Sequence, residues 1–353
     1  MQLYKIDGSS TAAGASVRMP DTFALPDWAP GLGLILLLAA IARLLGRYTG
    51  PIPDVVLALV IGIAVRNGLN PPGIAAGTKF TLFYVLRTAI ILLGAGLSIQ
   101  AVMKTGGATL ILVVSLVVTA MLLGLALARL FKLPGTIGTL IGAGTAICGG
   151  SAILTIGPIL GAAEEEIAYA ITTIFAFNIV ALLLYPIIGH GLAMTQTAFG
   201  SWAGTAVNDT SVVVATGYIF GTAAGAVATI VKLTRTVLLV PLAVIVGLAN
   251  ASAAGADASK SVVQRALKAT PWFVLGFIAM AALNSFGIFS ASVGHLLALV
   301  AAFLIVMVLA AVGLNVDLAK MLGLGPKPML VGFLLASIMS VCSYVLIALI
   351  GIR

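Results

Sequence analysis

Two polar clusters interrupt the apolar stretches of this chain, and their residue types could bind a solute. The first lies in residues 142–158, GAGTAICGGSAILTIGP, where repeated glycines weaken a helix and a proline breaks it. At membrane depth, broken backbone survives only where protein or a wet cavity satisfies its N–H and C=O groups. We therefore predict a substrate site here, although a glycine-rich packing face between helices would leave the same pattern. The predicted substrate-binding residues of this stretch are Thr145, Cys148, Gly149, Gly150 and Ser151.

The second cluster places Asn208, Asp209, Thr210 and Ser211 inside the apolar run 202–214. A charge at the bilayer centre costs roughly 2.5–3.5 kcal/mol, so such a group faces a cavity or a partner. An ionised Asp209 with oxygen-bearing neighbours could bind Na⁺, whereas a protonated Asp209 could carry H⁺. We predict a coupling-ion site at Asn208, Asp209 and Thr210, with a plain helix N-cap at Asp209 as the alternative.

Two basic residues, Lys232 and Arg235, lie three positions apart in a later apolar run and so share one helical face. Like charges this close repel each other, more so away from water. A negative group must therefore lie near: Asp209, a carbonyl edge or an anionic substrate. Because arginine suits oxyanions, we predict that both residues bind the substrate, with snorkelling to the membrane interface as the alternative. Arg87 occupies a similar place in an earlier run and receives the same interpretation.

Composition decides the class of protein that carries these clusters. A soluble domain is about 25% charged, whereas this chain of 353 residues is 61% apolar and 8% charged, with a mean hydropathy of +1.22. These values indicate an integral α-helical membrane protein. The net charge of +8 does not indicate nucleic-acid binding, because the basic residues stand singly between apolar runs, as in loops that set topology. Cys148 and Cys342 are too isolated for a metal site or a disulfide framework.

The apolar runs, of roughly 18 to 28 residues, predict about eleven transmembrane helices in a single transporter domain, residues 28–353. A polar tail, residues 1–27, precedes them and lacks the features of a secretory signal. The weakest run is 199–219, and we expect it to cross the membrane, because a re-entrant segment there would move the later basic loops outside. The runs are 28–46, 53–69, 80–100, 107–130, 136–160, 167–189, 199–219, 223–249, 271–288, 294–316 and 328–351.

A cytoplasmic N-terminus places most basic residues in inside loops, as the positive-inside rule requires. These inside residues are Arg66, Lys79, Arg129, Lys132, Lys260, Arg265, Lys268, Lys320 and Lys327. The outside loops would hold Arg43, Arg47, Lys104 and the acidic run 164–166. We therefore predict a cytoplasmic N-terminus.

Short echoes in the sequence suggest inverted repeats, in which two units face opposite ways across the membrane. RTAIIL at 87–92 resembles RTVLLV at 235–240, which would give two five-helix units after one leading helix. A second echo pairs GLSI at 96–99 with GLNV at 313–316, and a third pairs GTAI at 144–147 with GTAV at 204–207. The second echo implies a different register, so the register of the repeat is left open.

Three motifs together resemble one known family. ICGGSA at 147–152, WAGTAVNDTS at 202–211 and VKLTRTVLLVP at 231–241 are similar to the YeiH family of bacterial inner-membrane proteins, often described as sulfate exporters. The resemblance covers most of the chain beyond the N-terminal tail. It implies a helical bundle in which two broken helices cross at the midplane, as in bile-acid:sodium symporters and sodium/proton antiporters. Many members carry His-Glu where this chain has Asn208-Asp209, which leaves a histidine-based proton relay open.

These observations predict a secondary transporter of the bacterial inner membrane that moves a small anion, either sulfate or an organic anion, by alternating access coupled to Na⁺ or H⁺. Helix N-terminal dipoles at residues 149–151 would favour negative charge. We expect no enzyme activity, no cofactor, no nucleic-acid partner and no metal other than Na⁺ at Asp209, because no ATP-binding loop or catalytic set appears. The main alternative is a cation/proton antiporter that exchanges at Asp209, and a membrane enzyme or sensor subunit is a further one. A homodimer is left open.

Overall fold

The computed structural model describes residues 26–48, 53–251, 272–316 and 326–352. Within these ranges the chain is helical and has no strand, which confirms an all-α polytopic membrane protein. The polar tail up to residue 25 lies outside the described residues. So do four of the residues predicted for the inside loops, Lys260, Arg265, Lys268 and Lys320.

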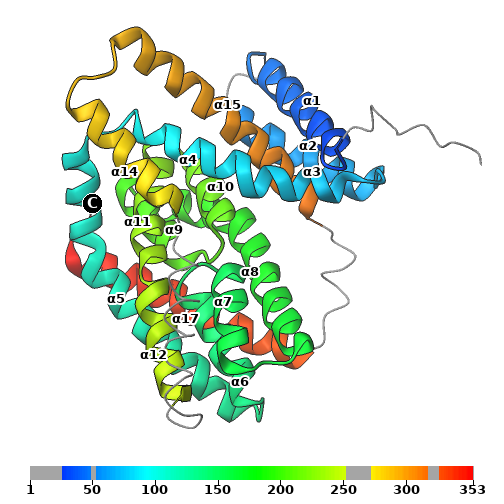
Figure 1. The fold of residues 1–353 in the computed structure, drawn as a ribbon, viewed down its shortest axis with the longest axis vertical. Helices are drawn as coiled ribbons and strands as arrows, with labels where there is room; N and C mark the ends of the chain where they lie inside the picture. Colours follow the sequence, from blue (N-terminus) through cyan, green and yellow to red (C-terminus); the bar gives the residue numbers. More distant parts are fainter. Residues whose placement is uncertain (1–25, 49–52, 252–271, 317–325, 353) are drawn as a thin grey trace, which may run out of the picture.

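The described helices form two groups (Figure 1). The upper group consists of α1 (Ala29–Gly46), α2 (Asp54–Gly68), α3 (Ile74–Phe80), the π-helical turn η1 (Thr81–Val85), α4 (Leu86–Gly94), α14 (Trp272–Ser285) and α15 (Ala291–Asn315). The lower group consists of α5 (Ile99–Leu130), α6 (Gly135–Ala146), α7 (Gly150–Leu160), α8 (Glu164–Gly191), α9 (Gln196–Ala206), α10 (Thr210–Phe220), α11 (Thr222–Val237), α12 (Leu239–Ala251) and α17 (Pro326–Ile350). Helices pack chiefly within their own group, and the main contacts between the groups run through α5 and α10.

Seven of the described helices are long and apolar enough to span a membrane. They are α1, the continuous helix α3–η1–α4, α5, α8, the continuous helix α11–α12, α15 and α17. Helices α2 and α14 are apolar but shorter, at 15 and 14 residues. The inverted repeats stay a prediction.

The first glycine-rich segment reverses direction at its break and forms a helical hairpin, α6–α7. A Cβ built on Gly157 of α7 would lie 3.8 Å from Leu140 Cδ2 of α6. Two residues this far apart in sequence would be about 25 Å apart along one continuous helix, so α7 runs back along α6. The turn occupies residues 147–149, where Gly149 has a φ of +64°, a value that side chains disfavour. The predicted interruption is confirmed, but the expectation that residues 136–160 span the membrane is wrong, and a hairpin replaces the crossing broken helix that the resemblance implies.

The second polar segment also forms a helical hairpin, α9–α10. Gln196 at the start of α9 accepts hydrogen bonds from Ala223 N (2.9 Å) and Ala224 N (3.1 Å) in the first turn of α11. Phe199 of α9 stacks on Phe220 at the end of α10, with ring centroids 3.8 Å apart. Both ends of the segment therefore lie together, and the expectation that residues 199–219 cross the membrane is wrong.

The lengths of α9 and α10 explain why residues 199–219 do not cross the membrane. The break at residues 207–209 leaves two helices of 11 residues each. Such a helix is about 16 Å long, whereas the hydrocarbon core is about 30 Å thick. A reversal lets each half-helix reach the middle of the protein and return.

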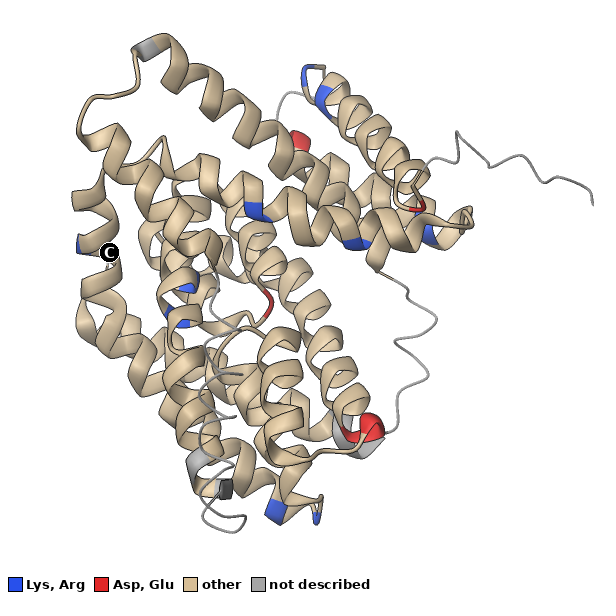
Figure 2. Ribbon diagram, viewed as in Figure 1, with Lys and Arg blue, Asp and Glu red and all other residues tan. Residues whose placement is uncertain are grey.

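The two reversals cancel in their effect on topology. The hairpin α6–α7 returns to the side on which α5 ends, and α9–α10 returns to the side on which α8 ends. The predicted orientation of the described helices that follow is therefore unchanged, whereas the acidic run 164–166 moves to the side of Arg129 and Lys132. Figure 2 shows the acidic start of α8 at the same end of the molecule as the basic residues between α5 and α6.

The upper group is held together by a close helix crossing and an ion pair. Helix α2 crosses α15 at Gly62 and Gly313, where a Cβ on Gly62 would lie 2.5 Å from Ala310 O. Small residues permit this approach between membrane helices. Arg43 of α1 also pairs with Asp54 of α2, at 3.0 Å. The upper group forms a wall that faces the two hairpins.

Candidate functional site

The two hairpins meet tip to tip, and this junction is the centre of the site. A Cβ built on Gly149 would lie 3.6 Å from Asp209 N, so the two interruptions are in van der Waals contact. Helices α6 and α9 end at the junction, while α7 and α10 begin there. Two helix ends with unpaired carbonyl groups and two with unpaired N–H groups therefore share one small region.

Lys232 of α11 binds the carbonyl ends of both hairpins. Its Nζ donates to Ile147 O at 2.7 Å, to Val207 O at 3.3 Å and to Asn208 O. The side chain is completely buried. An ammonium group has three N–H donors, so each donor of Lys232 has an acceptor.

Arg235 lies one turn further along α11 and binds the same two helix ends. It is also buried, and its Nε donates to Ala146 O at 2.5 Å. A guanidinium group has five N–H donors, and the five hydrogen bonds of Arg235 account for all of them. The other acceptors are Thr145 O, Thr205 O, Val207 O and Asn208 Oδ1.

The two cations bind equivalent positions of the two hairpins. The GTAI echo at 144–147 ends α6, and the GTAV echo at 204–207 ends α9. Arg235 binds the carbonyl of the second residue in both segments, and Lys232 binds that of the fourth. The third sequence echo therefore marks two matched carbonyl ends that are held by one pair of cations.

The negative partner that the sequence requires is thus the carbonyl edge. The ends of α6 and α9 carry the negative poles of their helix dipoles, which offset the repulsion between Lys232 and Arg235. Neither residue lines the cavity described below, and neither has an N–H left for a solute. The structure places both cations behind the junction, where they hold the hairpins and do not line the cavity.

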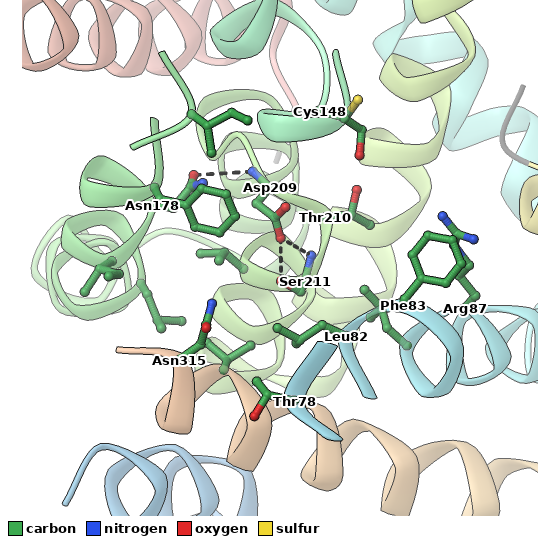
Figure 3. A pocket seen from close by; sticks show the side chains of 18 of the residues that line it. Thr78, Leu82, Phe83, Arg87, Cys148, Asn178, Asp209, Thr210, Ser211 and Asn315 are labelled. Atoms are coloured by element: carbon green, nitrogen blue, oxygen red, sulfur yellow. Dashed lines mark hydrogen bonds between the residues drawn. The ribbon is translucent and has the colours of Figure 1, made fainter. Parts of the chain in front are cut away.

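Asn178 of α8 and Asp209 fix the tip of the second hairpin (Figure 3). Asn178 Oδ1 accepts hydrogen bonds from Asn208 N (3.1 Å) and Asp209 N (3.3 Å), which join α8 to the tip of the second hairpin. Asp209 caps α10 by accepting from Ser211 N at 2.8 Å and from the Ser211 hydroxyl. The N-cap interpretation of Asp209 is therefore confirmed, and Asp209 also lines the cavity.

A cavity of about 960 Å³ lies between the hairpin tips and the upper group. The tips contribute Cys148, Ser151, Asp209, Thr210 and Ser211. The opposite wall comes from α2, α3, η1, α4 and α15, and its polar residues are Arg66, Thr78, Arg87 and Asn315. This volume suits a small organic molecule.

The structure divides the predicted site residues into two sets. Those that line the cavity are Cys148, Ser151, Asp209 and Thr210. Those buried at or behind the junction are Thr145, Gly149, Gly150, Asn208, Lys232 and Arg235. Sequence reasoning did not assign Arg66 or Asn315 to the site. Arg66 was missed because a basic residue near a span end looks like any topology-setting loop residue.

Comparisons with known proteins give one consistent result. The family model described as Conserved hypothetical protein 698 matches residues 30–332. A UPF0324 membrane protein of Streptococcus agalactiae serotype V is 37% identical over 310 residues, which cover 86% of this chain and 92% of the relative. A UPF0324 membrane protein of Clostridium tetani is 37% identical over 333 residues, covering 90% and 96%. One of Fusobacterium nucleatum is 34% identical over 347 residues, covering 91% and 98%.

Proposed function

The chain belongs to the UPF0324 family of membrane proteins, the YeiH family that its motifs resemble, and from that premise we propose that it is a secondary transporter of small anions. The observation that carries the proposal is the pair of hairpins that meet tip to tip against a cavity of about 960 Å³. Transporters use interrupted helices to aim backbone dipoles at a solute near the middle of the membrane.

The electrostatics of the junction support an anionic solute. The N-terminal ends of α7 and α10 begin at the junction, beside the cavity-lining Ser151 and Thr210, and a helix N-terminus favours negative charge. Lys232 and Arg235 stand behind these ends and are held by carbonyl groups, and among the described residues neither forms a salt bridge with a carboxylate. The hydroxyl groups of Ser151 and Thr210 would donate hydrogen bonds to the solute from the cavity wall.

Asp209 is the group that would couple transport to a cation. One of its carboxylate oxygens accepts hydrogen bonds from Ser211, and its side chain reaches the cavity wall. The other oxygen and the Thr210 hydroxyl offer hard oxygen ligands for Na⁺, or a site for H⁺. Binding of the cation would reduce the repulsion between Asp209 and an entering anion, which links the two solutes.

Alternating access would arise from movement between the two helix groups. The cavity lies between the hairpin tips and the upper group, while direct contacts between the groups run mainly through α5 and α10. A rocking motion about these contacts would open the cavity to one side and then to the other. We place the protein in the bacterial inner membrane with a cytoplasmic N-terminus, in keeping with the charge pattern of the loops.

Uptake into proteoliposomes tests the proposal. The purified protein is reconstituted, and entry of radiolabelled sulfate and of small carboxylates is followed under an imposed Na⁺ or H⁺ gradient. We expect gradient-driven anion uptake that Asp209→Asn uncouples from the gradient, while the exposed Glu165→Gln, which makes the same chemical change, leaves it intact. Absence of anion uptake under both gradients refutes the proposal.

A cation/proton antiporter is the second candidate, because Asp209 is a carboxylate on the wall of the cavity. In that case the same liposomes would exchange Na⁺ for H⁺ with no anion present. Asp209→Asn would abolish the exchange rather than uncouple it. Anion-independent exchange would therefore favour the antiporter over our proposal.

A further inference from the structure

The hydrogen bonds at the junction leave neither Lys232 nor Arg235 an N–H group for a solute. Lys232 and Arg235 have eight N–H donors between them. All of these donors bind protein oxygens. The two cations contribute a long-range electrostatic field, but neither has an N–H donor left to bind an anion. A direct counter-charge must come from another residue on the cavity wall.

Arg87 is placed to be that residue. It lies on α4, inside the apolar span 74–94, and it lines the cavity on the wall opposite the hairpin tips (Figure 3). Its guanidinium carbon lies 3.4 Å from the centroid of the Phe83 ring and 5.4 Å from that of Phe273. Contacts with ring faces hold the planar group in place and leave its in-plane N–H donors for an oxyanion.

The backbone before Arg87 has a local irregularity that positions this group. Residues Thr81–Val85 form a π-helical turn, closed by a hydrogen bond from Leu86 N to Thr81 O. Such single π turns are frequent at functional sites, because the extra residue shifts the side chains that follow around the helix. Here Leu82, Phe83 and Arg87 all line the cavity.

The remainder of the wall indicates what kind of anion fits. The large apolar side chains that line the cavity include Leu82, Phe83, Leu154, Ile171, Phe175 and Trp272. Among the described lining residues, the charged ones are Arg66, Arg87 and Asp209. A compact, strongly hydrated dianion would lose its water shell against apolar groups and would meet the Asp209 carboxylate. A single negative charge with an apolar body matches the apolar lining and the one guanidinium of Arg87.

We infer that the solute is an organic monoanion with an apolar body, and that its anionic group binds the Arg87 guanidinium across the cavity from the hairpin tips. This inference rests on the proposed transport function and assigns its substrate class. The apolar body would extend from Arg87 along Phe83, Phe175 and Trp272. The solute is therefore an amphipathic carboxylate or sulfonate and not sulfate.

Thermal unfolding of the purified full-length protein tests the inference with hexanoate, acetate and sulfate at equal ionic strength. A ligand that binds only the folded state raises the melting temperature. Sulfate also stabilises proteins in general by exclusion from their surface, so only a rise that is lost in Arg87→Met counts as binding. We expect such a rise for hexanoate, a smaller one for acetate and none for sulfate. The apparent affinity for hexanoate should fall at least about tenfold in Arg87→Met, as for loss of a hydrogen bond to a charged group.

Two variants serve as controls. Arg129→Met makes the same change at an exposed position of α5 and should keep the hexanoate response of the wild type. Arg87→Lys keeps the charge but loses the planar fork, and it should respond with intermediate affinity. It also provides the test if Arg87→Met does not fold.

The outcomes separate this inference from the proposed function. An unchanged hexanoate response in Arg87→Met, or a sulfate response that depends on Arg87, overturns the inference even where liposomes take up anions. Hexanoate binding that requires Arg87, without uptake of any anion into liposomes, overturns the transporter proposal and supports the binding site. Arg87-dependent binding together with hexanoate uptake supports both.

Discussion

Replacement of Lys232 by methionine tests the central feature of the structure, the cation clamp on the two hairpin tips. Methionine has nearly the same length and packs in apolar surroundings, but it donates no hydrogen bond. The change leaves Ile147 O and Asn208 O without their side-chain donor, while Val207 O keeps Arg235, at a cost of about 1–3 kcal/mol for each unsatisfied group. The ammonium no longer has to be desolvated, which offsets part of this cost. We therefore expect a net loss of about 1–4 kcal/mol, somewhat below the sum for two unsatisfied carbonyl groups.

Two measurements check this expectation on detergent-solubilised protein. The melting temperature should fall clearly below that of the wild type. Cys148 lies at the first hairpin tip and is buried, so a maleimide should label it slowly in the wild type and faster in Lys232→Met, with Cys342 replaced by serine throughout. Lys104→Met makes the same change on the exposed face of α5 and should alter neither quantity. Equal melting temperatures and equal labelling rates for the two variants would refute the clamp.

Three further predictions address the hairpins themselves. Gly149→Ala should destabilise the protein by about 1–2 kcal/mol in thermal unfolding because Gly149 has a φ of +64°, whereas Gly135→Ala, where a Cβ meets nothing within 4 Å, should not. Asn178→Leu should expose the amide groups of the second tip to faster hydrogen exchange, since Asn178 Oδ1 accepts two of them; unchanged exchange at that tip would count against its role. Cysteines placed at Arg129 and Glu165 in a cysteine-free background should react with an impermeant reagent from the same side of the membrane, and labelling from opposite sides would mean that residues 136–160 cross.

The sequence predicted the positions of the two interruptions but not the direction of the chain beyond them. The glycines and the Asn208-Asp209 pair weaken or cap helices through local geometry, so a single segment is enough to locate each break, whereas Pro158, expected to break the helix, lies inside α7. Whether the next helix continues or turns back depends on contacts with distant residues. The bond from Ala224 N to Gln196 Oε1 spans the whole second hairpin, and neither residue has a type that signals the pairing. The same local pattern therefore fits a crossing and a reversal.

The binding partner of the buried cations Lys232 and Arg235 was likewise only partly predictable from the sequence. Their spacing on α11 correctly predicted that a negative partner lies near. The identity of the partner could not be read from residue types, because backbone carbonyl groups occur at every position and become acceptors only where a helix ends. A side chain such as Arg87, by contrast, could be identified early, since a cation within an apolar run has few stable environments.

The matched contacts of Lys232 and Arg235 constrain how the site can move. Each cation binds the ends of both α6 and α9, so a shift of one hairpin relative to the other would break hydrogen bonds to both side chains at once. Because these bonds are buried, each one lost costs far more than it would in water. The hairpins and α11 should therefore move as one body. The contacts that can change at lower cost are those across the cavity, between the tips and the wall that carries Arg87. Access to the cavity would thus be controlled by the distance between these two surfaces, while the geometry of the junction stays the same in every state of the cycle.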